Sequence, residues 1–127
     1  MFGAHTDHPA FVALEMADAR HVLAEFRGGV RPEYFAGARV RFWTDGGPVR
    51  GRVRELLPAA APSPGQVVAM PRRALVAVPR AIAPDTIGMW DLPDPELRDG
   101  LVVARGCDDV AGAAALVALL QWLSRQQ

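Results

Sequence analysis

The chain has 127 residues, and its fourteen basic residues, all arginine, are balanced by fourteen acidic ones, so the formal net charge is zero. This balance argues against a nucleic acid or an anionic membrane surface as a partner recognised through bulk charge. The chain has no uninterrupted apolar run of about 20 residues, so we expect no membrane span. Cys107 is the only cysteine, which excludes an internal disulfide and favours a reducing compartment, the cytoplasm.

Eleven prolines and twelve glycines favour short strands and turns between residues 10 and 105. Short strands at this even spacing predict a small β-barrel. In chain order, the expected strands are Phe11–Met16, His21–Phe26, Ala38–Thr44, Val49–Leu57, Gln66–Met70, Ala74–Val78, Ile87–Trp90 and Leu101–Arg105.

The clearest hairpin joins ARVRFW to PVRGRVREL through TDGG, because Asp-Gly-Gly supplies the positive φ angles that a tight turn requires. The following PAAAPSPG, residues 58–65, is expected to be a loop, since three closely spaced prolines cannot lie inside a helix.

The end of the chain, VAGAAALVALLQWLSRQQ, is rich in alanine and leucine, has no proline and predicts a helix. Asp108 or Asp109 is a candidate cap for its first turn. From Val110 to Leu123 the residues are apolar nearly all round, so we expect burial on more than one side.

Two acidic motifs lie at opposite ends of the chain. Residues i and i+2 of a strand share a face, so His5 and Asp7 are expected to project together from the end of a first strand. Imidazole and carboxylate are common zinc donors, and an aspartate at a helix start can bridge two cations. An Asp-Asp pair before a helix is nevertheless more often a cap than a ligand.

Four motifs follow one another along the chain: HTD at residues 5–7, GGVRPEYFAGARVRFW, PVRGRV and LRDGLVVARGCDDVAG. Their order resembles that of the di-zinc aminopeptidases of the glutamyl and deblocking type, which assemble into tetrahedral shells. The resemblance implies an α+β fragment: a small inserted β-barrel flanked by a strand and a helix of a zinc-exopeptidase α/β domain. It implies residues 1–10 as the end of a catalytic strand, 11–103 as the barrel domain, and 104–127 as the return to the catalytic domain.

The resemblance also assigns roles to individual residues. It implies His5 as a terminal ligand of one zinc and Asp108 as the carboxylate that bridges both. Asp7 would be the catalytic-site carboxylate that orients His5 and raises its basicity. Asp109 would be a helix cap beside the site. The implied cofactors are two divalent ions, zinc or cobalt; the implied substrate is a peptide, and a homo-oligomer is expected.

The sequence departs from this family, because the family's Glu-Glu pair and its last Asp and His ligands would lie beyond Gln127. We therefore expect an aminopeptidase segment that binds no metal tightly and is inactive as this isolated chain. The alternative is a non-catalytic barrel that mediates oligomerisation or binds a partner.

Four other features have simpler interpretations. If the hairpin strands pair, Arg39, Arg41, Arg50, Arg52 and Arg54 form one face, which could bind phosphate or RNA but is more simply a solvated surface. Cys107 is expected to be a buried thiol beside the site. We expect His8 to be exposed or bonded to the backbone, and we find no partner motif for His21.

Overall fold

The protein is described by a computed structural model that covers residues 3–57 and 73–126. Its contacts divide the chain into two compact units. Pro9–Asp91 forms the first, here called the barrel unit, and Met1–His8 with Leu92–Gln127 forms the second, the helical unit. The expected domain ranges, 1–10, 11–103 and 104–127, refer to parts of a larger enzyme and stay a prediction.

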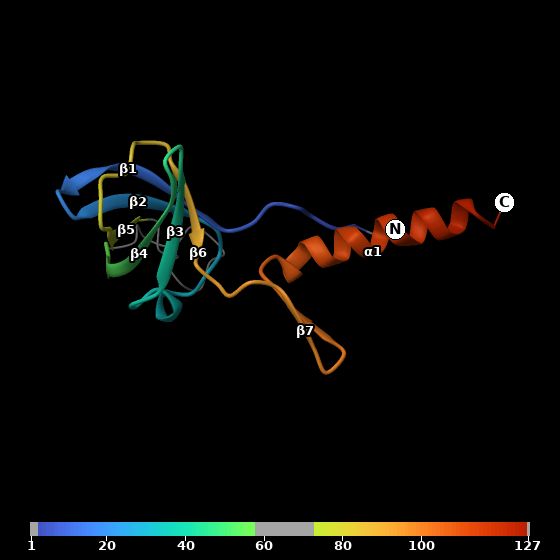
Figure 1. The fold of residues 1–127 in the computed structure, drawn as a ribbon. Coiled ribbons are helices and arrows are strands. Elements are labelled where there is room, and N and C mark those ends of the chain that lie inside the picture. Colours follow the sequence, from blue (N-terminus) through green and yellow to red (C-terminus); the bar gives the residue numbers. More distant parts are fainter. Residues whose placement is uncertain (1–2, 58–72, 127) are drawn as a thin grey trace, which may run out of the picture. The chain divides into compact units, whose positions relative to one another are not determined.

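Six antiparallel strands close the barrel unit in the order β1-β2-β5-β4-β3-β6 (Figure 1). Their bounds are β1 Ala10–Asp18, β2 His21–Arg27, β3 Arg39–Thr44, β4 Gly47–Leu56, β5 Arg73–Ala77 and β6 Ile87–Trp90. A single 3₁₀ turn, Pro32–Tyr34, lies between β2 and β3. The expected barrel is therefore confirmed, and closure leaves each of its six strands with two neighbours.

The expected hairpin is also confirmed as β3 and β4, with Thr44 opposite Gly47. Only Asp45 and Gly46 lie outside the strands, and Gly47 has the positive φ, 90°. The expected loop 58–65 and the expected strand Gln66–Met70 lie outside the described residues.

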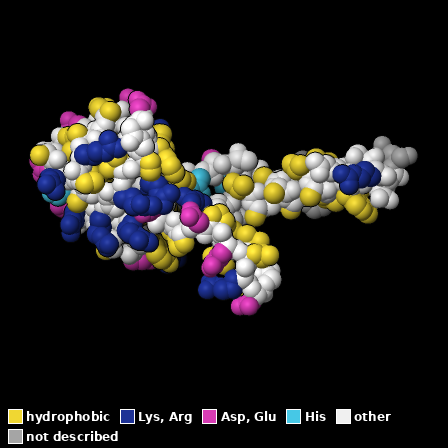
Figure 2. Space-filling view, viewed as in Figure 1, with side chains coloured by type: hydrophobic (Ala, Val, Ile, Leu, Met, Phe, Trp, Pro, Cys, Tyr) yellow, Lys and Arg dark blue, Asp and Glu magenta, His cyan; other side chains and the backbone are white. Residues whose placement is uncertain are grey.

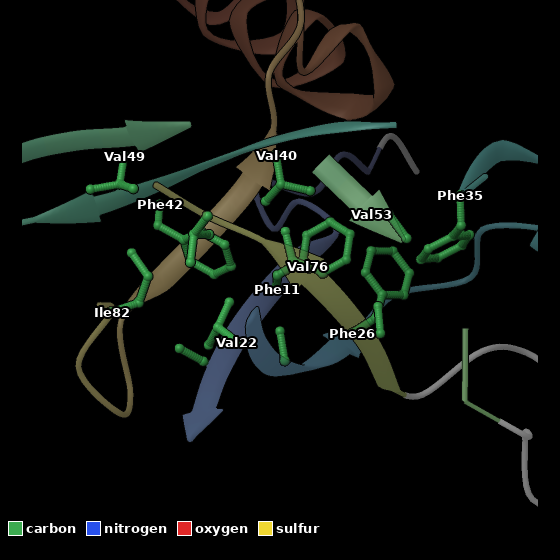
Figure 3. Close-up of a cluster of buried hydrophobic side chains, with 14 residues drawn as sticks. Phe11, Val22, Phe26, Phe35, Val40, Phe42, Val49, Val53, Val76 and Ile82 are labelled. Atoms are coloured by element: carbon green, nitrogen blue, oxygen red, sulfur yellow. The ribbon is translucent and has the colours of Figure 1, made fainter. Parts of the chain in front are cut away.

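Alternation along each strand builds the core. Val22, Ala24 and Phe26 of β2 are buried, whereas the residues between them are half-buried. This period of two places one face of each strand inside the barrel. Figure 3 shows the interior, filled by Phe11, Val22, Phe26, Phe35, Val40, Phe42, Val49, Val53, Val76 and Ile82.

Four aromatic rings lie against one another in this core. Phe11, Phe26, Phe35 and Trp90 lie with ring centroids 4.8–6.1 Å apart, mostly edge to face. Gly88 of β6 lies opposite Phe42 of β3, and a Cβ there would be 2.7 Å from the Phe42 ring. The glycine therefore lets the ring pack directly on the strand backbone.

One buried carboxylate lies just beyond β6. The Asp91 side chain is 5% exposed, and it accepts hydrogen bonds from Nε of Arg41 at 2.7 Å and Nε of Arg50 at 3.1 Å. Burial alone would raise the pKa of Asp91, but the hydrogen bond and charge of Arg41, aided by Arg50, hold that pKa below its ordinary value. Asp91 thus links β3 and β4 to the end of β6.

The helical unit has a short hairpin and one regular helix. Strands β7, Glu96–Arg98, and β8, Leu101–Val103, pair only with each other among the described strands. The strand expected at Leu101–Arg105 therefore exists but is not part of the barrel. A turn of π-helix, η2 (Cys107–Ala111), leads into α1, Gly112–Ser124.

The expected burial of the last helix is wrong for this chain. None of the residues of α1 is buried, and Val117, Leu120 and Trp122 are more than half exposed. Figure 2 shows hydrophobic side chains along α1. The physical reason is that, among the described helices and strands of the helical unit, only the adjoining η2 makes extensive contact with α1.

The segment Cys107–Ser124 is long and apolar enough to cross a membrane by composition, with a mean hydropathy of 1.2. However, Asp108 and Asp109 lie in its first turn and do not have helical φ/ψ angles. The regular helix has 13 residues and rises about 20 Å, whereas a hydrocarbon core is about 30 Å thick. The absence of a membrane partner stays an expectation.

Candidate metal centre

The structure brings the three sequence-predicted site residues together. Nε2 of His5 lies 3.5 Å from Oδ1 of Asp108, and Nδ1 of His5 lies 3.1 Å from Oδ1 of Asp7. Nδ1 is also 3.3 Å from the backbone carbonyl oxygen of Asp7. The imidazole therefore faces one carboxylate with each nitrogen, and the two carboxylates come from opposite ends of the chain.

The local structure that places His5 and Asp7 differs from the expected strand end. Residues 3–9 have no regular secondary structure, and β1 begins only at Ala10. A strand requires a hydrogen-bonded neighbour, and no described strand pairs with this segment. His5 and Asp7 are therefore in contact without belonging to a described sheet.

The expected helix cap is also wrong. The N-cap residue of α1 is Ala111, and no side chain caps the helix by a hydrogen bond. The reason is the backbone of η2: Asp108 and Asp109 have φ/ψ of (−106°, 100°) and (−128°, 29°), outside the helical range. The Asp109 carboxylate instead accepts a hydrogen bond from the backbone N–H of His5 at 3.4 Å.

Gly112 makes room for this arrangement. A Cβ on Gly112 would overlap the carboxylate of Asp109. Asp109 can therefore lie against the first residue of α1 and still reach His5. In the sequence, Gly112 was only one position of a motif. A signal for its role is nevertheless present, because a glycine follows the acidic Asp109 by three positions at the start of a helix.

The electrostatics of the site favour a positive charge at His5. Desolvation lowers the pKa of His5, but the Asp7 carboxylate and carbonyl, together with the charges of Asp108 and Asp109, raise that pKa above its ordinary value. The side chains of Asp7 and Asp108 are 93% and 97% exposed, so solvent screens these ion pairs strongly. The carboxylates around His5 therefore favour its protonated form, in a setting that is open to solvent.

The donor set fits a divalent ion in part. Two donors bonded to one zinc at about 2.0–2.2 Å in tetrahedral geometry are about 3.3 Å apart, close to the observed 3.5 Å between His5 and Asp108. Asp7 on the other ring nitrogen matches the carboxylate that orients a ligating histidine. Within residues 3–57 and 73–126, no group of three or more His, Cys, Asp or Glu side chains is arranged to hold a metal.

Comparisons with known proteins find similarity in fold to solved structures. No family model matches the chain, and no curated protein matches it. Among solved structures, it is similar to a protein described as a "putative peptidase/endoglucanase", with a TM-score of 0.65 and 24% identity over 98% of this chain. The fold of this chain therefore resembles part of that protein.

A second solved structure with a similar fold is the TET1 peptidase of Pyrococcus horikoshii, with a TM-score of 0.66 and 19% identity over 94% of this chain. This chain spans 37% of the first of these proteins and 38% of the second, a little over a third of their length. At such identities the likeness supports the α+β architecture with its closed barrel, while the specific family stays a prediction.

Three other residues differ from expectation in their burial or in their partners. Cys107 is exposed, not buried, because η2 lies on the surface. His8 is half-buried, and its Nδ1 is enclosed without a hydrogen-bond partner in the described part of the chain. His21 does have a partner: its Nδ1 lies 2.9 Å from Oδ2 of Asp18 across the β1–β2 turn. The pair was visible in the sequence as Asp-x-x-His.

Proposed function

We propose that this chain is part of a metal-dependent aminopeptidase that removes N-terminal residues from peptides. The proposal rests mainly on one observation: His5 and Asp108 lie within 3.5 Å although the whole barrel unit separates them in sequence. The peptidase-like structural neighbours support the same reaction class. In this interpretation the barrel is an insertion between two ligand-bearing segments.

Each of the site residues has a distinct task in the proposed enzyme. His5 and Asp108 would hold a divalent ion, zinc or cobalt, and Asp108 would be shared with a second ion. Such ions polarise a peptide carbonyl and lower the pKa of a bound water when they are present. Asp7 would hold the His5 ring through Nδ1, so that the lone pair of Nε2 is presented to the ion. Asp109 would fix the backbone of His5.

Zinc binding to the purified chain tests this assignment by isothermal titration. We expect one weak site, which is lost in His5→Ala and Asp108→Asn and weakened about tenfold or more in Asp7→Asn. His21→Gln is the matched control, because it removes a second His–Asp pair on the barrel. Equal zinc binding by the wild type and His5→Ala would contradict the metal assignment and favour the non-catalytic barrel module.

Activity gives a second test. With two donors for one ion among the described residues, the isolated chain should release no amino acid from a peptide. Release that a chelator abolishes would show that the chain is complete for catalysis.

We further propose that the protein works as a homo-oligomer in the cytoplasm. The TET1 peptidase, a structural neighbour, can assemble into a tetrahedron or a large octahedral shell. The exposed apolar side chains of α1 support association, and the single cysteine suits a reducing compartment. Light scattering of the purified chain tests the oligomer, for which we expect a mass above that of one chain. Cell fractionation of a tagged chain tests the location, for which we expect the tag in the cytoplasmic fraction.

A further inference from the structure

We propose that the barrel unit carries a binding groove for a small ligand with two or three phosphate groups. The groove is a hollow of about 490 Å³ on the outer face of β2, β5, β4 and β3. Its charged lining consists of Arg20, His21, Arg39, Arg50, Arg52 and Arg54, and no acidic side chain of the described residues lines it. The groove lies wholly within the barrel unit and does not depend on the proposed metal centre.

Strand register explains why the hollow exists. Arg39 lies opposite Arg52, Arg52 opposite Ala77, and Ala77 opposite His21, so the four residues form one row across four strands. Adjacent strands are about 4.8 Å apart, so the backbones that carry Arg52 and His21 are about 10 Å apart. The short side chain of Ala77 leaves the space between them open.

The positive charges in this row are unusual for neighbouring strands. Like charges directly opposite each other destabilise a sheet, and Arg39 opposite Arg52 is such a pair. Arg39, Arg54 and Arg20 have no carboxylate partner among the described residues, and the residues outside that range include no Asp or Glu. Arg52 donates to the carbonyl oxygen of Gly37 at 2.8 Å, which leaves its charge uncompensated.

Two other lining residues are partly compensated. Arg50 shares the buried Asp91 with Arg41, and His21 contacts Asp18. The chain's zero net charge hides the imbalance, because the barrel unit holds eleven arginines against eight acidic residues, a net charge of +3. Figure 2 shows arginine side chains gathered on the barrel. A surface that concentrates cations in a hollow attracts an anion.

The residue types favour phosphate over other anions. Guanidinium groups are planar forks that bind phosphate oxygens in pairs, and every basic residue in the groove other than His21 is arginine. Within residues 3–57 and 73–126, no aromatic side chain other than His21 lines the hollow, so successive bases of a single-stranded nucleic acid would have little to stack on. The length of the row suits a short chain of phosphates.

Titration of the whole chain with inorganic tripolyphosphate at low salt tests the proposal. We expect saturable binding that weakens at least tenfold in the double variant Arg39→Gln, Arg52→Gln. The matched control is Arg27→Gln with Arg31→Gln, which removes the same charge from the same barrel. Those two arginines pair with Glu25 and Glu33 and do not line the groove.

A second variant separates shape from charge. Ala77→Leu fills the hollow and keeps every arginine, and its side chain points away from the core, so the barrel should fold normally. We expect Ala77→Leu to bind tripolyphosphate at least tenfold more weakly than the wild type. Absence of binding by the wild type, an equal loss in the control, or unchanged binding by Ala77→Leu would overturn the proposal. Citrate binding as tightly as tripolyphosphate, or an oligonucleotide binding more tightly, would overturn the assignment to a small phosphate ligand.

Discussion

The buried carboxylate of Asp91 allows a sharp prediction about stability. Arg41 and Asp91 have side chains only 14% and 5% exposed, so neither can regain full hydration when its partner is removed. Asp91→Asn keeps the shape but removes the charge that compensates Arg41. A hydrogen bond to a charged group contributes about 1.5–3 kcal/mol, and breaking a buried pair costs about 3–5 kcal/mol. Arg50 is 68% exposed and adds little.

We therefore expect Asp91→Asn to lower the free energy of unfolding at pH 7 by about 3 kcal/mol. For a unit of this size, that corresponds to a fall in Tm of roughly 12–24 °C. Near-ultraviolet circular dichroism measures the transition, because Trp90 packs among the core phenylalanines. Glu25→Gln is the control: it breaks an ion pair of 2.9 Å with Arg27 that is exposed, and its effect should stay below about 1 kcal/mol.

The pH dependence gives a second check. The pKa of Asp91 is lower in the folded protein than the ordinary value of about 3.9 expected in the unfolded chain. Its contribution is complete well above that value and is lost as pH falls through the folded pKa. The difference between wild type and Asp91→Asn should therefore shrink below about pH 4. Equal stability at pH 7, or a difference that does not change with acid, would refute this reasoning.

Three further substitutions test other features of the structure. Gly88→Ala places a Cβ against the Phe42 ring and should cost about 1–3 kcal/mol in a denaturant titration, whereas Gly29→Ala, with open space around it, should be nearly neutral. Arg39→Thr removes a like-charge pair and should raise the free energy of unfolding by roughly 0.2–1 kcal/mol; a loss would contradict the charge argument. Leu120→Glu places a charge on a side chain that is 66% exposed and should reduce self-association in light scattering, which an unchanged mass would contradict.

The strand predictions succeeded where local signals were strong. Alternating apolar residues in β2 and the Asp-Gly-Gly turn before β4 are readable from neighbouring residues alone, and both elements lie close to where we expected them. The helix prediction succeeded for its position but was wrong for its burial. Periodicity shows that a helix is apolar, but it contains no information about what covers that helix.

The candidate site shows the same division. His5, Asp7 and Asp108 were selected from motif order, and the structure brings their side chains together. Motif order could not reveal that Asp109 contacts His5 instead of capping α1, because that depends on the non-helical backbone of η2. The metal roles of these residues remain predictions, which the zinc titration addresses.

By itself, the sequence determined residue types, strand periods and turns, because these are local properties of the chain. Tertiary structure alone decided which distant groups meet: Asp91 with Arg41, His5 with Asp108, and the row from Arg39 to His21. Closure of the barrel sets strand order and register. Register brings arginines that are scattered in the sequence into one groove, although the net charge of the whole chain is zero. The physical reason is that pairing between distant strands depends on the packing of the whole barrel and not on any short segment.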